Sequence, residues 1–147
     1  MLLRRLIGLT CALAGAAAPA LCAMASSKPA NRLVEARFDT FNRHDLNGLV
    51  ALYAPDAVLT SPGFCQDRVG LAGARRAYGE LFQAVPDIQD RVTLVVIDQN
   101  HIAIQFIARS TRPGAAFEAH IANFLTVDHG LITRDDAYYD AKGRPCT

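Results

Sequence analysis

Near its C-terminal end the chain carries two β-patterned runs separated by a tight turn, and this hairpin restricts the fold more than any other segment. It spans residues 117–140 and turns at Asp128-His129-Gly130, where a glycine suits a backbone position of positive φ. The second run mixes acidic and aromatic side chains with apolar neighbours: Asp135, Asp136, Tyr138, Tyr139 and Asp140. Such a mixed strand is typical of a pocket wall rather than of a fully dry core.

The rest of the pattern places helices first and strands afterwards. Apolar residues at helical spacing predict helices over residues 29–43 and 71–84, with a short helix between them that Asp45 can cap. A short β-run is expected at residues 57–61. Four longer strands are predicted at residues 88–97, 101–111, 115–127 and 131–139. Their short turns favour antiparallel neighbours, so the pattern predicts an α+β domain with helices packed on one face of a curved sheet.

The N-terminus has the pattern of a secretory signal peptide. Arg4 and Arg5 precede an apolar, acid-free stretch at residues 6–21, and small residues follow it. We therefore expect cleavage before Ser26, which makes residues 1–25 a signal peptide and the mature protein periplasmic or secreted. A transmembrane helix is the alternative, but the apolar stretch is shorter than the ~20 residues that a span needs.

The mature chain, residues 26–147, is one domain of ordinary size. Without Arg4 and Arg5, the 15 basic residues become 13, against 14 acidic residues, which gives a net charge of about −1. A nucleic-acid-binding protein would show a basic surface stripe, so near-neutrality argues against that class. We expect no membrane association after the signal peptide is removed.

Export would leave two cysteines, Cys65 and Cys146. An even number of cysteines in an oxidising compartment favours a disulfide between them. It would close a loop of ~80 residues, for which the chain-entropy model gives roughly 4–5 kcal/mol. Two free thiols are the alternative. The cysteines and histidines lack the spacing of metal ligands, so no metal site is predicted.

Three segments resemble a SnoaL-like polyketide cyclase domain: FNRHDLNGLVALYAPDAVLTSPG at residues 41–63, the helix that closes on Pro86-Asp87, and the Gly130 hairpin with its Tyr138-Tyr139-Asp140 ending. This family belongs to the nuclear transport factor 2-like superfamily, with ketosteroid isomerases and limonene epoxide hydrolases. The resemblance implies a cone-shaped fold in which three N-terminal helices pack on a strongly curved antiparallel sheet and enclose a hydrophobic pocket. It also implies chemistry without a metal or organic cofactor, and a homodimer formed through the sheet.

The sequence lacks the catalytic residues of the ketosteroid isomerases in this superfamily. Ketosteroid isomerases carry a base Asp just before the proline that ends the first strand, and Ser61 occupies that position. They also use a Tyr on the first helix, where the alignment places Arg37 or a neighbour. A serine hydroxyl without an adjacent base does not shuttle protons near neutral pH, so a steroid isomerase is disfavoured.

The cyclases and epoxide hydrolases of the family use an acid on the last strand, and the cyclases add a His on the strand before it. The ungapped alignment puts the acid at Ala137, so either the alignment shifts to Asp136 or the acid is missing. His120 is the candidate on the preceding strand. A catalytic pair of His120 and Asp136 is feasible because cross-strand partners lie ~5 Å apart at Cβ, but the register of the hairpin stays open. The alternatives are a hydrogen-bonded strand histidine, a salt bridge of Asp136 with a nearby Arg, and a solvated Asp135.

Aromatic side chains and one amide are expected to contact a ligand in the pocket. The predicted set is Tyr53, Phe64, Phe82, Phe106, Asn123 and Tyr138. For most of the aromatic residues, filling of the core is the alternative. Two functions follow from these residues. One is a cofactor-free acid/base enzyme acting on a hydrophobic, carbonyl-bearing small molecule; the other is a non-catalytic ligand-binding protein or a structural dimer.

Overall fold

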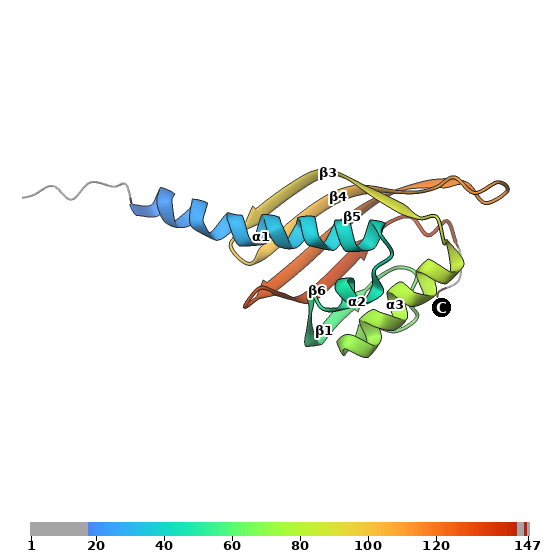
Figure 1. The fold of residues 1–147 in the computed structure, drawn as a ribbon, viewed down its shortest axis with the longest axis horizontal. Coiled ribbons are helices and arrows are strands. Elements are labelled where there is room, and N and C mark those ends of the chain that lie inside the picture. The colour runs from blue at the N-terminus through green and yellow to red at the C-terminus, as the bar shows by residue number, and fades with distance from the viewer. Residues whose placement is uncertain (1–17, 144–145, 147) are drawn as a thin grey trace, which may run out of the picture.

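The computed structural model describes residues 18–143 and residue 146, with side chains from residue 29 onward. The helices in this part of the chain are α1 (Ala18–Asn42), α2 (Leu46–Val50) and α3 (Gly70–Ala84). The strands are β1 (Tyr53–Thr60), β2 (Arg68–Val69), β3 (Gln89–Asp98), β4 (His101–Ser110), β5 (Phe117–Asp128) and β6 (Leu131–Tyr138). The helices precede the four long strands, which confirms the predicted α+β class (Figure 1).

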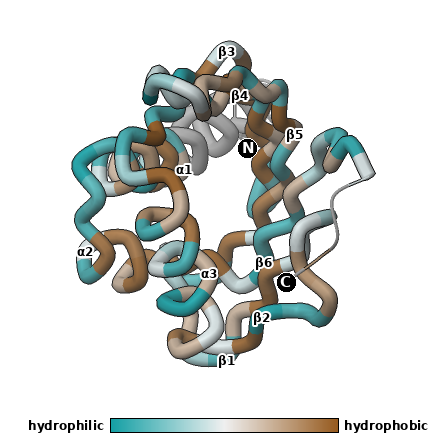
Figure 2. Tube along the Cα trace, turned by 90° about the vertical axis from the view of Figure 1, so that its right-hand side faces the viewer, coloured by the Kyte–Doolittle hydropathy of each residue, from teal (hydrophilic) through white to brown (hydrophobic). Residues whose placement is uncertain are grey.

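The described strands form one six-stranded sheet in the order β2-β1-β6-β5-β4-β3. Neighbouring strands are antiparallel except β1 and β6, which are parallel. This exception is possible because β1 and β6 are far apart in sequence, so no short turn dictates their relative direction. Figure 2 shows the sheet bending from β1 through β6 and β5 to β3, with the helices on its concave side. The predicted cone of helices against a strongly curved sheet is therefore confirmed, with a mostly antiparallel sheet.

Helices form at the segments in which apolar residues recur at helical spacing. Val34, Phe38 and Phe41 on α1 are buried against the sheet side, and the Phe38 ring meets Phe106 of β4 at 5.2 Å between centroids. The side chain of Asp45 caps α2 by accepting a hydrogen bond from the backbone N–H of Gly48 at 2.9 Å, as predicted. An N-terminal cap of this kind contributes about 1 kcal/mol to a short helix, so the turn between α1 and α2 is locally encoded.

The four long strands begin and end within two residues of their predicted bounds. The predicted turn between β5 and β6 is present, with φ of 48° at His129 and 81° at Gly130. Two consecutive residues in the left-handed region give a turn whose twist matches the flanking strands, which is why a glycine stands there.

A β-bulge in β6 changes which side chains face the helices. Consecutive β5 residues 126–127 pair with Arg134 and Ile132, so Thr133 is an extra residue in β6. One inserted residue reverses the alternation of side chains beyond it. Ile132 and Asp135 are therefore both buried on the concave side, although they are three positions apart.

The expected signal peptide lies largely outside the described residues, which begin at 18. α1 runs through the expected cleavage position, and its first described buried side chain is Ala30. Pro29 lies inside this helix; after cleavage before Ser26 it would stand in the first turn, where proline is tolerated. Among the described helices, none is long and apolar enough to cross a membrane.

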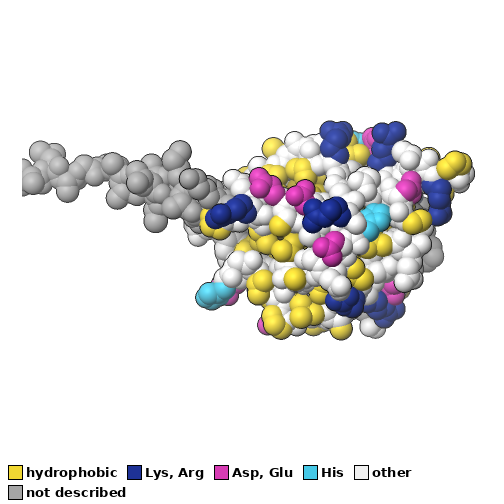
Figure 3. Space-filling view, viewed as in Figure 1, with side chains coloured by type: hydrophobic (Ala, Val, Ile, Leu, Met, Phe, Trp, Pro, Cys, Tyr) yellow, Lys and Arg dark blue, Asp and Glu magenta, His cyan; other side chains and the backbone are white. Residues whose placement is uncertain are grey.

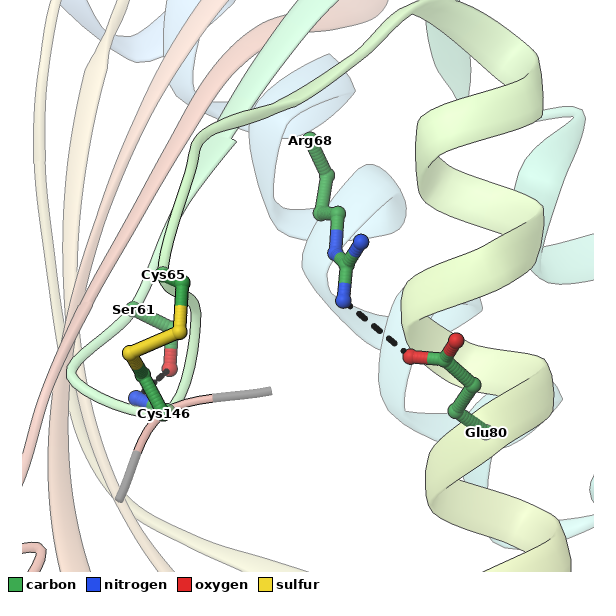
Figure 4. Close-up of a disulfide and its surroundings, with 6 residues drawn as sticks. Ser61, Cys65, Arg68, Glu80 and Cys146 are labelled. Atoms are coloured by element: carbon green, nitrogen blue, oxygen red, sulfur yellow. Dashed lines mark hydrogen bonds and ion pairs between the residues drawn. A yellow bond between two sulfur atoms is a disulfide. The ribbon is translucent and has the colours of Figure 1, made fainter.

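A disulfide joins Cys65 and Cys146, which are separated by 81 residues, as predicted (Figure 4). It connects the loop after β1 to the C-terminal segment. In the same region Arg68 of β2 forms an ion pair with Glu80 of α3 at 3.2 Å, which links this loop to the helix layer (Figure 4). A disulfide is compatible with an exported protein.

Candidate active site

A cavity of about 420 Å³ lies between α1, α3 and the concave face of the sheet. Much of its wall is apolar and includes Phe41, Leu59, Leu81, Ile88, Phe106 and Ile121. Its polar lining includes Arg37, Tyr78, Asp90, Asn123 and Asp135. A concave, mainly apolar space with a few polar groups is the usual form of a small-molecule site.

Asp135 of β6 is a buried anion at this cavity, with 4% of its surface exposed. Its Oδ2 accepts hydrogen bonds from the Tyr53 hydroxyl at 2.5 Å and from Arg37 Nη2 and the Tyr78 hydroxyl at 3.2 Å each. Its Oδ1 accepts from Asn123 Nδ2 at 2.6 Å. One carboxylate thus holds four polar side chains, which come from α1, β1, α3 and β5.

These contacts determine the protonation states of Asp135 and of the two tyrosine hydroxyls. Burial opposes ionisation of Asp135, but the charge of Arg37 and the hydrogen bonds from Asn123 and Tyr53 outweigh it and lower the pKa of the carboxyl. Burial, with the neighbouring Asp135 charge, raises the pKa of Tyr53 and of Tyr78, although Arg37 opposes the rise at both. Both hydroxyls therefore stay protonated and act as donors. Asp135 is a fixed negative charge rather than a proton carrier.

Asp90 of β3 is a second carboxyl at the same cavity, in a different environment. It is 8% exposed, and its Oδ1 has no hydrogen-bond partner among the described residues. Burial raises the pKa of this carboxyl to about 7, although the charge of Arg37 opposes the rise. Near neutral pH the group therefore exists in both protonated and ionised forms, as a general acid or base requires.

The backbone of Asp90 is held by Asn42, the last residue of α1. Asn42 Oδ1 accepts from the Asp90 backbone N–H at 2.7 Å, and Asn42 Nδ2 donates to the Asp90 carbonyl at 2.9 Å. This two-point contact joins β3 to the end of α1 and leaves the carboxyl itself uninvolved. The site thus combines a fixed backbone with a carboxyl available to a ligand.

Several buried polar atoms at the cavity have no hydrogen-bond partner within the described part of the chain: Arg37 Nε and Nη1, Asn123 Oδ1 and Asp90 Oδ1. We call them the open polar atoms. Buried polar atoms are nearly always paired, so their gathering at one cavity indicates a place for the polar groups of a ligand or for water. No cluster of three or more His, Cys, Asp or Glu side chains among the described residues is arranged to hold a metal ion.

One side of the cavity is built from the loop after β1 and the C-terminal segment. Phe64 and Tyr139 line it there, and the Ser61 hydroxyl donates to the Tyr139 hydroxyl at 3.2 Å. The Arg68 guanidinium lies 5.1 Å from the centre of the Phe64 ring, a cation–π contact. The disulfide and the hydrogen bond between Ser61 and Tyr139 hold the loop against the C-terminal segment.

The sequence model of the SnoaL-like domain matches residues 34–135, which is most of the chain and contains both carboxyls. The chain belongs to the SnoaL-like family. Among curated proteins, none matches this sequence.

Solved structures share the fold at low sequence identity. A loop truncation variant of IdmH is 26% identical, with a TM-score of 0.68 over 77% of this chain and 93% of that one. SalBIII, an epoxide hydrolase/cyclase-like enzyme in pyran ring formation in the polyether salinomycin, is 15% identical, with a TM-score of 0.70 over 79% and 94%. A protein of ketosteroid isomerase-like fold from Catenulispora acidiphila is 18% identical, with a TM-score of 0.68 over 74% and 85%. The family match places this SnoaL-like protein in the nuclear transport factor 2-like superfamily, and these structures share its fold.

His120 does not lie at the cavity of this SnoaL-like protein. It stands on the outer face of β5, where its side chain is 79% exposed and its Nε2 lies 3.8 Å from Glu118 Oε1. Its cross-strand partner is Ile107 of β4, whereas the described pairing of β5 with β6 starts only at Ala122. The register therefore separates His120 from Asp136, and the predicted catalytic pair does not form.

Asp136 also faces away from the cavity. Its carboxylate accepts hydrogen bonds from Arg134 Nε and from Thr60 Oγ1, both at 2.7 Å, so the alternative interpretation as a salt bridge is the correct one. The bulge at Thr133 is the physical reason, because it turns Asp135 inward in place of its neighbour. The prediction that Asp135 is a solvated charge is wrong for the same reason.

The predicted ligand-contacting residues divide into two groups. Phe64, Phe106 and Asn123 line the cavity. The other three are Tyr53, Phe82 and Tyr138. Tyr53 contributes its hydroxyl to Asp135, Phe82 packs on Phe41 and His44, and Tyr138 is an exposed residue of the outer sheet face.

Sequence reasoning missed Asp90 and the role of Arg37, although each left a signal. Arg37 lies three residues after Val34 and four before Phe41, within the apolar stripe of the first helix. Asp90 alternates with Ile88 and Val92 in a strand whose face should be buried. A charge at a position that the pattern reserves for apolar side chains is the informative exception.

Proposed function

We propose that this SnoaL-like protein is a cofactor-independent acid/base enzyme that moves a proton on an apolar, carbonyl-bearing small molecule. The observation that carries the proposal is the Asp90 carboxyl, which is buried in a mainly apolar cavity with a pKa of about 7. General catalysis is most effective when the pKa of the group is near the working pH. Asp90 is the proton-transferring residue in place of the predicted His120 and Asp136.

The reaction begins when ionised Asp90 removes a proton from the carbon next to the carbonyl group. The C–H bond breaks, its electron pair forms the C–C double bond, and the carbonyl oxygen becomes an enolate oxygen. Arg37 Nε and Nη1 are donors suited to that oxygen, and Asp135 holds the guanidinium in place at 3.2 Å. Protonated Asp90 then returns the proton to carbon or to oxygen, which completes an isomerisation or prepares a ring closure.

Two findings support this chemistry over binding alone. The two carboxyls at one cavity have pKa values pushed in opposite directions, an arrangement that assigns distinct acid/base roles. Among proteins of the same fold, SalBIII is an epoxide hydrolase/cyclase-like enzyme. The non-catalytic alternative predicts that the Asp90 carboxyl has no effect on any reaction.

Deoxybenzoin, an apolar ketone with exchangeable α-protons, tests the proposal. We expect the purified protein to accelerate exchange of these protons with D2O, as followed by NMR, with a rate that rises with pH and levels off above about 7. Asp90→Asn should reduce the exchange rate by at least about 100-fold, the usual contribution of general acid/base catalysis, and leave deoxybenzoin affinity within a few-fold.

Asp136→Asn is the matched control, because it removes a carboxylate that faces away from the cavity. It should exchange deoxybenzoin at the wild-type rate. Unchanged exchange in Asp90→Asn, or no acceleration by the wild-type protein, would reject catalysis by Asp90.

We also propose that two copies associate through the outer face of the sheet. Large apolar side chains are exposed there on three strands: Leu94, Val96, Phe124 and Tyr138. The rings of Phe124 and Tyr138 meet edge to face with centroids 5.7 Å apart. Exposed apolar patches of this kind mark association surfaces. On the face in Figure 3, basic and acidic side chains are interspersed among apolar ones.

The wild-type protein is expected to elute as a dimer in size-exclusion chromatography with light scattering, and Phe124→Asp as a monomer. A charge placed in an apolar interface loses its hydration without gaining a partner. Val69→Asp is the control, since Val69 is an exposed apolar residue of β2 at the other end of the sheet. A monomeric wild-type protein, or a dimeric Phe124→Asp, would contradict this interface.

A further inference from the structure

The polar part of the cavity specifies both a hydrogen-bond donor and an acceptor in its ligand. Asp135 engages Nη2 of Arg37 and Nδ2 of Asn123, one with each carboxylate oxygen. The remaining atoms of the two side chains, Arg37 Nε and Nη1 and Asn123 Oδ1, are open polar atoms. Both residues are nearly fully buried, at 4% and 1% exposure. Their pairing therefore depends on what enters the cavity.

The chemical direction of each contact is determined. An ionised carboxylate only accepts hydrogen bonds, so the group of Asn123 that lies 2.6 Å from Asp135 must be the NH2. Asn123 therefore presents its oxygen as the open atom, and this oxygen requires a donor. A guanidinium only donates, so Arg37 requires an acceptor. A ligand that satisfies both carries a donor and an acceptor.

The spacing of the two groups is short. The two oxygens of one carboxylate span Arg37 and Asn123, so these side chains lie within reach of a single small head group. The neighbouring oxygens of an α-hydroxy ketone supply one acceptor and one donor within such a head group. The carbonyl oxygen would accept from Arg37 and the hydroxyl would donate to Asn123.

The charge balance favours a neutral head group. Arg37 is already neutralised by Asp135 in an ion pair at 3.2 Å, and each side chain is 5% exposed. Asp90 adds a second acidic group to the same cavity. An anionic ligand would lose its hydration without finding an uncompensated positive charge.

We infer that the ligand is a neutral apolar molecule with a hydroxyl group next to its carbonyl, bound through Arg37 and Asn123; this inference rests on the proposed function for the identity of the reacting carbonyl. The hydroxyl distinguishes such a molecule from a simple ketone. The cavity of about 420 Å³ leaves its apolar walls to hold the body of the molecule.

Three probes of matched size test the inference by calorimetric titration: benzoin, which has the hydroxy ketone; deoxybenzoin, which has the ketone alone; and diphenylacetate, which is anionic. We expect benzoin to bind roughly tenfold more tightly than deoxybenzoin, since its hydroxyl pairs an otherwise unsatisfied buried oxygen. Diphenylacetate should bind most weakly. Equal affinities for benzoin and deoxybenzoin would mean that water satisfies Asn123, and tighter binding of diphenylacetate would mean an anion site; either result overturns the inference.

Asn123→Leu removes the acceptor and should abolish the preference for benzoin. Asn47→Leu makes the same replacement at an exposed position of α2 and should preserve it. If Asn123→Leu does not fold, the wild-type affinity ratio still decides. Deoxybenzoin exchange in Asp90→Asn is a separate measurement, so the proposed catalysis can fail while the binding preference holds, and the reverse.

Discussion

Replacing Asp135 by asparagine is expected to lower the free energy of unfolding by about 3–5 kcal/mol, the usual effect of removing one partner of a buried ion pair. Arg37 is the main reason, because its side chain is 5% exposed and would keep an unpaired charge in the interior. The two oxygens of the Asp135 carboxylate now accept from several donors, including Asn123 and Tyr53. An amide at this position has only one oxygen, and its NH2 group would face one of these donors. Urea unfolding followed by circular dichroism measures the change.

Asp136→Asn provides the comparison one residue away. Its ion pair with Arg134 is formed by a half-exposed guanidinium, and such pairs contribute about 1 kcal/mol or less. If Asp135→Asn yields too little folded protein, Tyr53→Phe removes a single donor and should reduce the unfolding free energy by about 1–2 kcal/mol. Equal losses from Asp135→Asn and Asp136→Asn would contradict the assignment of Asp135 as the buried anion.

Elements that depend on local chemistry could be predicted from the sequence. The Asp45 cap and the His129-Gly130 turn each require a particular residue at one backbone position, and the structure has both. The four long strands were recognisable because side chains alternate within each of them. The pairing of Cys65 with Cys146 was predicted from the number of cysteines in the expected mature chain, without any knowledge of the fold.

The choice between neighbouring acids could not be made in this way. Asp135 and Asp136 differ only in the face they occupy, and the Thr133 bulge decides that face. Nothing in the local sequence requires an extra residue there, since threonine is an ordinary strand residue. The register against β5 sets the bulge, and register is a property of the whole sheet. An alternation count through residues 131–138 therefore selects the wrong carboxylate.

The role of Arg37 required tertiary information of another kind. Its partners Tyr53, Tyr78 and Asp135 come from three separate elements, at sequence distances of 16 to 98 residues. The sequence indicates only that a charge interrupts an apolar stripe. That a carboxylate on a distant strand compensates it depends on how α1 crosses the sheet.

The environments of Asp135 and Asp90 explain why one fold can hold two buried acids with different properties. Asp135 accepts four hydrogen bonds and is ionised. Asp90 is also buried, but its Oδ1 lacks a partner in the described residues, so desolvation dominates. Burial alone favours the neutral form, and only compensating donors reverse that preference. Asp90, the acid that suits proton transfer, is therefore the one whose ionised form the fold stabilises less.

Asp90→Asn is accordingly expected to stabilise the protein at pH 8, by up to about 4 kcal/mol relative to wild type, and to change its stability little at pH 4. The pKa of Asp90 is about 7 in the folded state against an ordinary value of 3.8, a difference of about 3 units. Each unit corresponds to about 1.4 kcal/mol. Between these two values the folded state keeps a proton that the unfolded state releases, so the wild-type stability contributed by this group falls as pH rises from about 4 to 7.

We would measure urea unfolding of wild type, Asp90→Asn and Asp56→Asn at intervals between pH 4 and pH 8. The Asp56→Asn variant shows how much stability changes when an exposed carboxyl is lost. Asp56 is an exposed residue of β1, so its replacement should stay within about 0.5 kcal/mol of wild type. The Asp90→Asn curve should diverge upward from wild type as pH rises; parallel curves would show that Asp90 is ionised freely in the folded state and is unsuited to the proposed proton transfer. If the curves diverge and Asp90→Asn also loses deoxybenzoin exchange, the protein retains Asp90 for activity at the expense of stability. The reason is that the carboxyl destabilises the fold in the pH range where it is ionised and able to accept a proton.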